Sequence, residues 1–198
     1  MSLAGEVLAE WQARLQLRSL GDAGDGSFVV DEFDGDGDIV PSVSFPHHDL
    51  FEAIDEYNAR WLVMLDPETA AVAGLGLSMS RAMGAREIEL LGSLLSGDYT
   101  FTDHRAVGWP ALSRAEMLEA TSANADTRTR WLTTELYASS HTALVAQGGF
   151  WTPSAGSWYE VDAGIFVTLV QGNQLVRTEV FTADQLEPAL RRFDELTT

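Results

Sequence analysis

Four long runs with strand composition follow one another in the C-terminal part of the chain. They cover Arg130 to Ser139, Thr142 to Trp151, Trp158 to Val170 and Leu175 to Phe181. Gly172-Asn173 separates the last two runs and is a hairpin signal, because both residues tolerate the positive φ angles of a tight turn. Long, consecutive strands joined by short turns predict one strongly bent antiparallel sheet, so other segments have to cover its faces.

The segments before residue 66 show both helical and strand patterns. Residues 3–18 carry apolar side chains at helical spacing, which predicts an amphipathic helix. Residues 27–33 and 39–45 have strand composition, and the acidic, glycine-containing run 34–38 between them favours a turn. A further helix is predicted from Asp49 to about residue 65, because Pro67 marks its end.

The middle of the chain completes an α+β order of elements. Residues 69–95 are helical in pattern, and their glycines indicate two or three helices. Residues 99–105 alternate like a strand, Ser113 and Glu116 form a capping box that opens another helix, and residues 184–196 form a closing helix. A length of 198 residues suits one full domain with an appendage. We expect residues 1–65 to be a helix-strand-helix appendage and residues 66–198 to be the main domain.

Composition excludes several classes of function. The 12 basic residues other than His are all Arg, against 30 Asp and Glu, and the net charge of −18 disfavours nucleic acid and anionic lipid as partners. The absence of Cys removes disulfides, zinc fingers and thiol nucleophiles, and the absence of Lys removes Schiff-base chemistry. No apolar run is long enough to span a membrane, and no leader pattern opens the sequence. We therefore expect a soluble, cytoplasmic protein without a cofactor.

The acidic run Asp34-Gly-Asp-Gly-Asp38 raises the question of calcium binding. An EF-hand loop needs Gly at its sixth position and Glu at its twelfth. Ile39 and Phe45 stand at those positions, so an acidic turn is the better interpretation and no metal site is predicted.

Residues from about 70 to 198 resemble the SnoaL-like branch of the nuclear-transport-factor-2-like superfamily. The resemblance lies in Tyr99-Thr-Phe-Thr-Asp-His-Arg105 after two helices, in the hairpins from Arg130 to Val170, and in Gly172-Asn-Gln-Leu-Val-Arg-Thr-Glu-Val-Phe181. It implies a cone-shaped sheet packed on helices, with an apolar pocket inside the cone. The closing helix is also similar to the ends of such domains in actinobacterial regulatory proteins.

Asp103 is the first candidate catalytic residue, with His104 and Tyr99 as candidate hydrogen-bond donors. Asp103 shares one face of its strand with Tyr99 and Phe101, so an apolar cavity on that face would raise its pKa and make it a general base. His104 points to the opposite face. The alternative, which we favour, is that Asp103 or His104 holds the turn at the strand end together with Arg105.

The predicted ligand pocket combines aromatic and charged residues. Glu160 and Asp162 lie two positions apart, so they share a face with Phe166, either inside the cone or in solvent. Arg177 and Glu179 have the same spacing on the last strand, where they either reach the pocket or pair with neighbouring strands. The full predicted set is Phe101, Trp109, Glu160, Asp162, Phe166, Arg177 and Glu179.

Two classes of function remain open from the sequence. The first is a module without catalysis that binds a small hydrophobic ligand or serves as a dimerising sensory domain. The second is an isomerase, cyclase or hydrolase that acts on a small hydrophobic ring compound, with Asp103 as the base.

A homodimer is the predicted assembly. The strands between Arg130 and Val170 carry Trp131, Trp151 and Trp158, which would leave much apolar surface in water on a monomer. The competing prediction is that residues 27–65 cover the same sheet face within one chain, which would make the protein a monomer.

Overall fold

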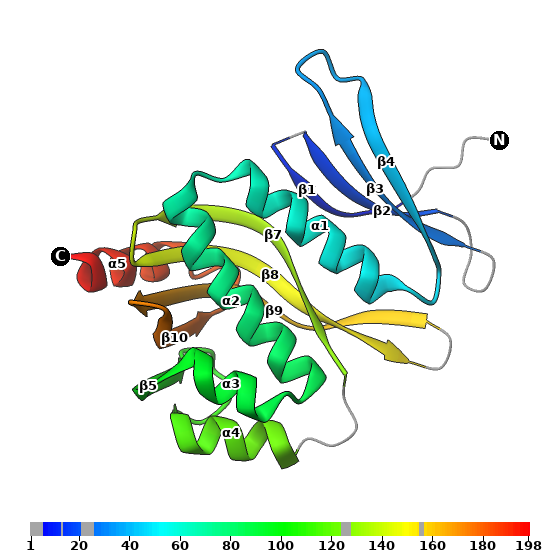
Figure 1. Ribbon diagram of the computed structural model, residues 1–198. Coiled ribbons are helices and arrows are strands. Elements are labelled where there is room, and N and C mark those ends of the chain that lie inside the picture. The colour runs from blue at the N-terminus through cyan, green and yellow to red at the C-terminus, as the bar shows by residue number, and fades with distance from the viewer. Residues whose placement is uncertain (1–5, 13, 21–25, 124–127, 155–156) are drawn as a thin grey trace.

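Helix α1 (Leu50–Met64) joins two β-sheets in the computed structural model (Figure 1). The structure describes residues 6–12, 14–20, 26–123, 128–154 and 157–198, without the side chains of residues 6, 153, 154 and 157–162. An α+β fold is therefore confirmed.

The N-terminal sheet is a four-stranded antiparallel meander in the order β1-β2-β3-β4. Its strands are β1 (Glu6–Trp11), β2 (Leu15–Leu20), β3 (Ser27–Phe33) and β4 (Ile39–Pro46). Leu15, Leu17, Phe28 and Val30 are buried in the core that this sheet shares with α1. The strands predicted at 27–33 and 39–45 are present with nearly the predicted limits.

The helix predicted over residues 3–18 is wrong. Residues 6–11 and 15–20 instead form the antiparallel strands β1 and β2, in which Trp11 pairs with Leu15, and Gln12 adopts a φ of 48°. The alternating burial of Leu15 and Leu17 fits a strand, although the wider spacing of apolar residues imitates a helix. Packing against α1 favours the strand, because it buries the face of β2 that carries Leu15 and Leu17.

The Asp34 carboxylate organises the turn between β3 and β4. Its Oδ1 accepts hydrogen bonds from the backbone N–H groups of Asp36 (2.9 Å) and Asp38 (3.0 Å). Gly37 has a φ of 86°, a conformation that glycine adopts without strain. One carboxylate of the acidic run is thus used by the turn itself.

The second sheet has six strands in the order β6-β5-β10-β9-β8-β7. They are β5 (Leu95–Asp103), β6 (Leu112–Ser113), β7 (Arg130–Ser139), β8 (Ala143–Ser154), β9 (Ser157–Gln171) and β10 (Gln174–Phe181). The four long strands lie within three residues of their predicted limits. The sheet is mixed rather than purely antiparallel, because β10 runs parallel to β5.

Helices cover both faces of this sheet. On the inner side lie α2 (Pro67–Ala85), α3 (Ile88–Leu94) and α4 (Arg114–Ala123). The predicted capping box opens α4, since the Ser113 backbone N–H donates to Glu116 (2.7 Å). On the outer side lies α5 (Leu186–Thr197), which packs on β8 and β9.

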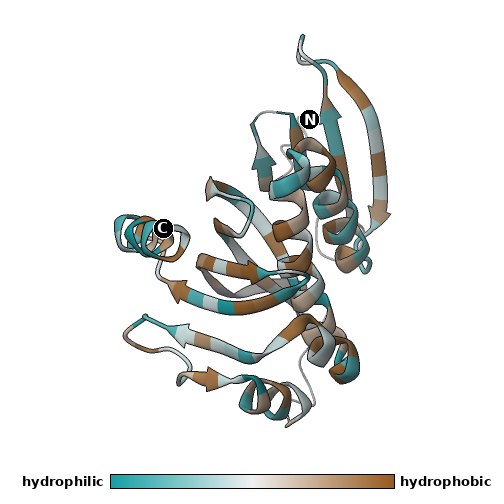
Figure 2. Ribbon diagram, turned by 60° about the vertical axis from the view of Figure 1, so that its left-hand side comes forward, coloured by the Kyte–Doolittle hydropathy of each residue, from teal (hydrophilic) through white to brown (hydrophobic). Residues whose placement is uncertain are grey.

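The strands therefore bury both of their faces. Ile165 and Val167 lie under α5 in a separate small core, whereas Phe166 between them packs against the main core on the inner side. Figure 2 shows polar and apolar residues alternating along the strands.

Helix α1 connects the N-terminal sheet to the second sheet. Trp61 of α1 meets Trp11 of β1 edge to face, with ring centroids 5.9 Å apart, and the Asn58 side-chain amide donates to the Trp131 carbonyl of β7 (2.7 Å). One continuous hydrophobic core runs through these contacts. The division into an appendage and a main domain at residue 65 stays a prediction.

Candidate ligand-binding pocket

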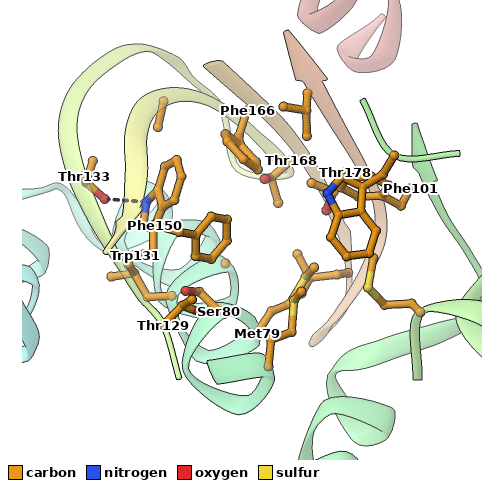
Figure 3. A pocket seen from close by; sticks show the side chains of 18 of the residues that line it. Met79, Ser80, Phe101, Thr129, Trp131, Thr133, Phe150, Phe166, Thr168 and Thr178 are labelled. Atoms are coloured by element: carbon orange, nitrogen blue, oxygen red, sulfur yellow. Dashed lines mark hydrogen bonds between the residues drawn. The ribbon is translucent and has the colours of Figure 1, made fainter. Parts of the chain in front are cut away.

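A cavity of about 560 Å³ lies between the inner side of the second sheet and helices α2 and α4. Its volume falls in the range of about 300–1,000 Å³ that is typical of sites enclosing small organic ligands. Trp131, Phe150 and Phe166 form an aromatic cluster along one wall (Figure 3). Trp131 meets Phe150 and Phe166 edge to face, with ring centroids 5.1 and 4.5 Å away.

Two contacts fix the Trp131 indole in this wall. Its Nε1 donates a hydrogen bond to the Thr133 hydroxyl (3.1 Å), which is drawn in Figure 3. Gly148 on β8 leaves the space that the ring occupies, because a Cβ atom there would lie 2.5 Å from the indole and 2.2 Å from the Leu132 carbonyl oxygen. The ring is thus preorganised as a flat apolar surface.

The remaining walls are largely apolar, and the loop after β5 adds exposed apolar side chains to the lining. Helices α2 and α4 and the inner strands contribute aliphatic and thioether side chains, namely Leu77, Met79, Met83, Met117, Leu144, Ala146, Leu175 and Val180. Val107 and Trp109 of the loop line the cavity and are also exposed, by 95% and 48%. They place apolar groups where the cavity lining meets solvent.

Among the described lining residues, six carry hydroxyl groups: Ser80, Thr121, Thr129, Thr133, Thr168 and Thr178. The Thr121 hydroxyl donates to the Met117 carbonyl (2.8 Å), and the Thr133 hydroxyl accepts from Trp131. The hydroxyls of Ser80 and Thr178 are buried and, within the described residues, have no hydrogen-bond partner. Two of these four hydroxyls thus have structural partners, and the other two are buried in the wall without a partner among the described residues.

Arg105 is the one charged side chain among the described residues that line the cavity, and it is paired with Asp103. Its Nε and Nη2 donate to the two Asp103 oxygens at 2.8 and 2.6 Å. The backbone N–H groups of Arg105 (3.0 Å) and Trp109 (2.9 Å) donate to the same carboxylate. Asp103 therefore ties the loop after β5 to the end of that strand.

The expectation that an apolar cavity raises the pKa of Asp103 is wrong. Burial acts to raise this pKa, but the hydrogen bonds from Arg105 and Trp109 and the charge of Arg105 outweigh burial and lower it. The geometry fits the interpretation in which Asp103 holds the strand-end turn, because its oxygens are occupied by the loop.

Tyr99 lies behind the cavity wall and is 1% exposed. Its phenol donates to the Met79 sulfur at 3.8 Å, and burial raises its pKa. The Thr178 hydroxyl offsets part of this shift, although it does not reach the phenol in hydrogen-bond geometry. Within the described structure, Tyr99 supports the lining residues Met79 and Thr178.

His104, Arg177 and Glu179 meet on the outer side of the sheet, which corrects the prediction that Arg177 and Glu179 line the pocket. Glu179 is 2% exposed and accepts from His104 Nε2 (2.7 Å), Arg177 (3.3 Å) and Arg192 of α5 (2.9 Å). The His104 ring also stacks on Phe181, with centroids 4.4 Å apart. Burial acts to raise the pKa of Glu179, but hydrogen bonds and charges from His104 and Arg192 lower it. Thr178 and Val180, which alternate with Arg177 and Glu179 along β10, line the cavity instead.

The other predicted pocket residues divide into two groups. Phe101, Trp109 and Phe166 line the cavity. The side chains of Glu160 and Asp162 lie outside the described residues, where β9 pairs with Trp151 and Phe150 of β8 through its backbone. Sequence reasoning missed the contribution of α2, whose Met79, Ser80 and Met83 line the cavity although Arg81 lies between them in the sequence.

The packing of the tryptophans removes part of the basis for a homodimer. Trp131 is 9% exposed and lines the cavity, and Trp151 packs against the main core. The Trp158 side chain lies outside the described residues. The outer face of the sheet carries α5, whereas the N-terminal layer reaches the second sheet through β7. A homodimer stays a prediction.

No described helix combines the length and apolar character that crossing a membrane requires.

Fold and pocket together define an α+β cone that encloses an apolar cavity. No protein-family model and no curated protein match the chain. Solved structures with a similar fold include Rv0760c of Mycobacterium tuberculosis (16% identity, 58% of this chain and 92% of that chain, TM-score 0.48). Others are the Δ5-3-ketosteroid isomerase of Mycobacterium sp. (16%, 58% and 95%, 0.46) and a hypothetical protein of Catenulispora acidiphila with a ketosteroid isomerase-like fold, in complex with trimethylamine (14%, 61% and 92%, 0.44).

The substitution Asp103→Asn is expected to loosen the loop after β5. An amide keeps one acceptor oxygen and loses the charge that Arg105 meets, so we expect about 2 kcal/mol of destabilisation in thermal unfolding. Asp98→Asn on the same strand, where the carboxylate accepts from the Ser96 hydroxyl, is the control and should unfold like the wild type. An unchanged midpoint for Asp103→Asn would show that the carboxylate does not hold the loop.

Proposed function

We propose that the protein binds an uncharged, largely apolar ring compound and does not itself catalyse a reaction. The observation that carries this proposal is the chemistry of the lining. Among the described residues, the cavity has no Asp, Glu or His side chain, and its one arginine is neutralised by Asp103.

The lack of unpaired charge favours an uncharged ligand. A charged group that enters an apolar cavity loses its hydration, and this loss is costly unless an opposite charge receives the group. Arg105 already shares its guanidinium with Asp103, so an ion that enters the cavity meets no side chain of opposite charge, other than this paired arginine, among the described lining residues.

The aromatic wall favours a ligand that contains rings. Trp131, Phe150 and Phe166 are held in edge-to-face contact, which leaves flat faces and ring edges for a further ring. Their positions are fixed by packing, so binding costs little side-chain entropy.

The alternative, an isomerase, cyclase or hydrolase with Asp103 as general base, has less support. A base has to reach the proton it removes, and the two Asp103 oxygens accept four hydrogen bonds from its own loop. A dimerising sensory role is compatible with a binding pocket and stays a prediction.

Three biphenyls that differ in charge test the proposal by calorimetric titration at pH 7. We expect 4-hydroxybiphenyl to bind at least about tenfold more tightly than both biphenyl-4-carboxylate and 4-(aminomethyl)biphenyl, because a charged group entering the cavity is desolvated without a partner.

The cation is the internal control for the overall charge of the protein. A net charge of −18 attracts a cation, so tighter binding of 4-(aminomethyl)biphenyl that weakens in 1 M salt would reflect surface attraction, whereas tighter binding that persists in 1 M salt would contradict a neutral pocket. Failure of all three compounds to bind would contradict the proposal as a whole.

A further inference from the structure

We infer that the ligand carries an uncharged oxygen function, namely an alcohol, a phenol or a carbonyl, and that the Thr168 hydroxyl binds it and sets the orientation of the ligand. This inference rests on the proposed function and specifies its ligand. Thr168 lies on β9, lines the cavity and is 6% exposed, so it is a nearly buried polar residue on a largely apolar wall.

The Thr168 hydroxyl differs from the other buried hydroxyls of the lining. Those of Thr121 and Thr133 form hydrogen bonds within the protein. The hydroxyl oxygens of Ser80 and Thr178 have almost no accessible surface and lie within the wall. In the described part of the chain, the Thr168 oxygen has no hydrogen-bond partner and is not enclosed in this way, so it faces the open cavity.

Thr168 lies beside the aromatic cluster. Phe166 precedes it by two residues on the same face of β9, and the strand neighbours of Thr168 are Leu144 on β8 and Thr178 on β10. Figure 3 shows Thr168 between Phe166 and Thr178, at the edge of the open space. A ring that packs on Phe166 therefore meets the Thr168 hydroxyl with an oxygen about 7 Å further along the strand, which is the reach of a second ring.

The other polar groups that face the cavity are satisfied in different ways. The Arg105 guanidinium is shared with Asp103. Trp109 is 48% exposed, and Thr129 is half-buried before the start of β7, so water can hydrate both side chains. Thr168 combines access to the cavity with near-complete burial, and a ligand in the cavity is the partner that it can meet.

The energetic argument concerns what a ligand displaces. A ligand that excludes water from a buried hydroxyl loses affinity unless it restores the hydrogen bond. An apolar atom against the Thr168 hydroxyl would leave that group desolvated and unpaired, whereas a ligand oxygen removes this penalty. Because a hydroxyl both donates and accepts, an alcohol, a phenol and a carbonyl oxygen all suit the position.

Calorimetric titration of biphenyl and 4-hydroxybiphenyl tests the inference, because the two compounds differ by one oxygen at the end of the second ring. The titrations use the wild type, Thr168→Val, which removes the hydroxyl and keeps the size of the side chain, and Thr168→Ser, which keeps the hydroxyl. Thr178→Val is the matched control, because it removes the hydroxyl of the residue paired with Thr168 on β10, whose oxygen lies within the wall.

The variants are expected to separate the two ligands. Thr168→Val should weaken binding of 4-hydroxybiphenyl about tenfold, bind biphenyl at least as tightly as the wild type, and unfold no earlier. Thr168→Ser and Thr178→Val should keep the wild-type ratio of the two affinities. A merely structural role of Thr168 would instead change both affinities alike.

Two failures are distinguishable in this experiment. An affinity ratio that Thr168→Val leaves unchanged, or that Thr178→Val removes instead, would overturn the inference while the proposed function stands. Absence of binding by both compounds would contradict the inference and the proposed function together.

Discussion

Gly148→Ala is expected to destabilise the protein by about 3 kcal/mol and to abolish ligand binding. The new methyl group would lie 2.2 Å from the Leu132 carbonyl oxygen and 2.5 Å from the Trp131 ring. Backbone cannot move aside as a flexible side chain can, so the cost lies at the upper end of that found for overpacked cores. In a chain of this size the unfolding midpoint should fall by about 6–12 °C.

Gly97→Ala is the matched control for this prediction. Gly97 also lies in a strand of the second sheet, on β5, but a Cβ atom there meets nothing within 4 Å. We expect its unfolding midpoint to remain that of the wild type. If Gly148→Ala also unfolded like the wild type, Trp131 would not be held as described.

Glu179→Gln is expected to destabilise the protein by about 3 kcal/mol. The amide loses the charge that pairs with Arg192 and Arg177 at a nearly fully buried position, so part of the charge of the two arginines is left unpaired. Breaking a buried pair costs about 3–5 kcal/mol, and the partial exposure of the two arginines reduces that value. Glu195→Gln is the control: it removes an exposed partner of the same Arg192 and should cost less than about 1 kcal/mol.

The same cluster predicts how stability depends on pH. The pKa of Glu179 lies below its ordinary value of 4.5, so its contribution to stability is fully present above about pH 4.5 and is lost as pH falls through the lower pKa of the folded protein. Chemical unfolding should therefore show a shallower loss of stability below pH 4.5 for Glu179→Gln than for the wild type. Parallel curves for the two proteins would contradict this assignment.

The sequence predicted those elements whose local signals agree with their packing. Gly172-Asn173 marks the β9–β10 hairpin, and Ser113 with Glu116 opens α4, because the residues that form each feature are neighbours in the chain. The strands at residues 6–11 and 15–20 were missed because Gln12, which follows the first of them, is not a turn-forming residue type, and packing on α1 overrides the helical spacing.

The pocket was predictable in part of its aromatic lining only, because Trp131 and Phe150 were not among the predicted pocket residues. Phe101 and Phe166 lie on strands, where the alternation of side chains predicts which face they share, and Trp109 is an exposed aromatic residue of the loop after β5. By contrast, a bulge in β10 between Leu175 and Arg177 helps to decide which residues of the last strand face the cavity. The pairing of Asp103 with Arg105, two positions away, was visible in the sequence, but the contribution of α2 to the lining is recognisable only once α2 is placed against the sheet.

The most direct test of a ligand-binding cavity is to fill it from one wall. Gly76 and Gly74 both lie on α2 with open space around the position of a Cβ atom, and of the two Gly76 lines the cavity. Calorimetric titration with 4-hydroxybiphenyl should therefore show wild-type affinity for Gly74→Phe and a loss of at least about tenfold for Gly76→Phe. Equal affinity in both variants would place the ligand elsewhere and contradict the proposed pocket.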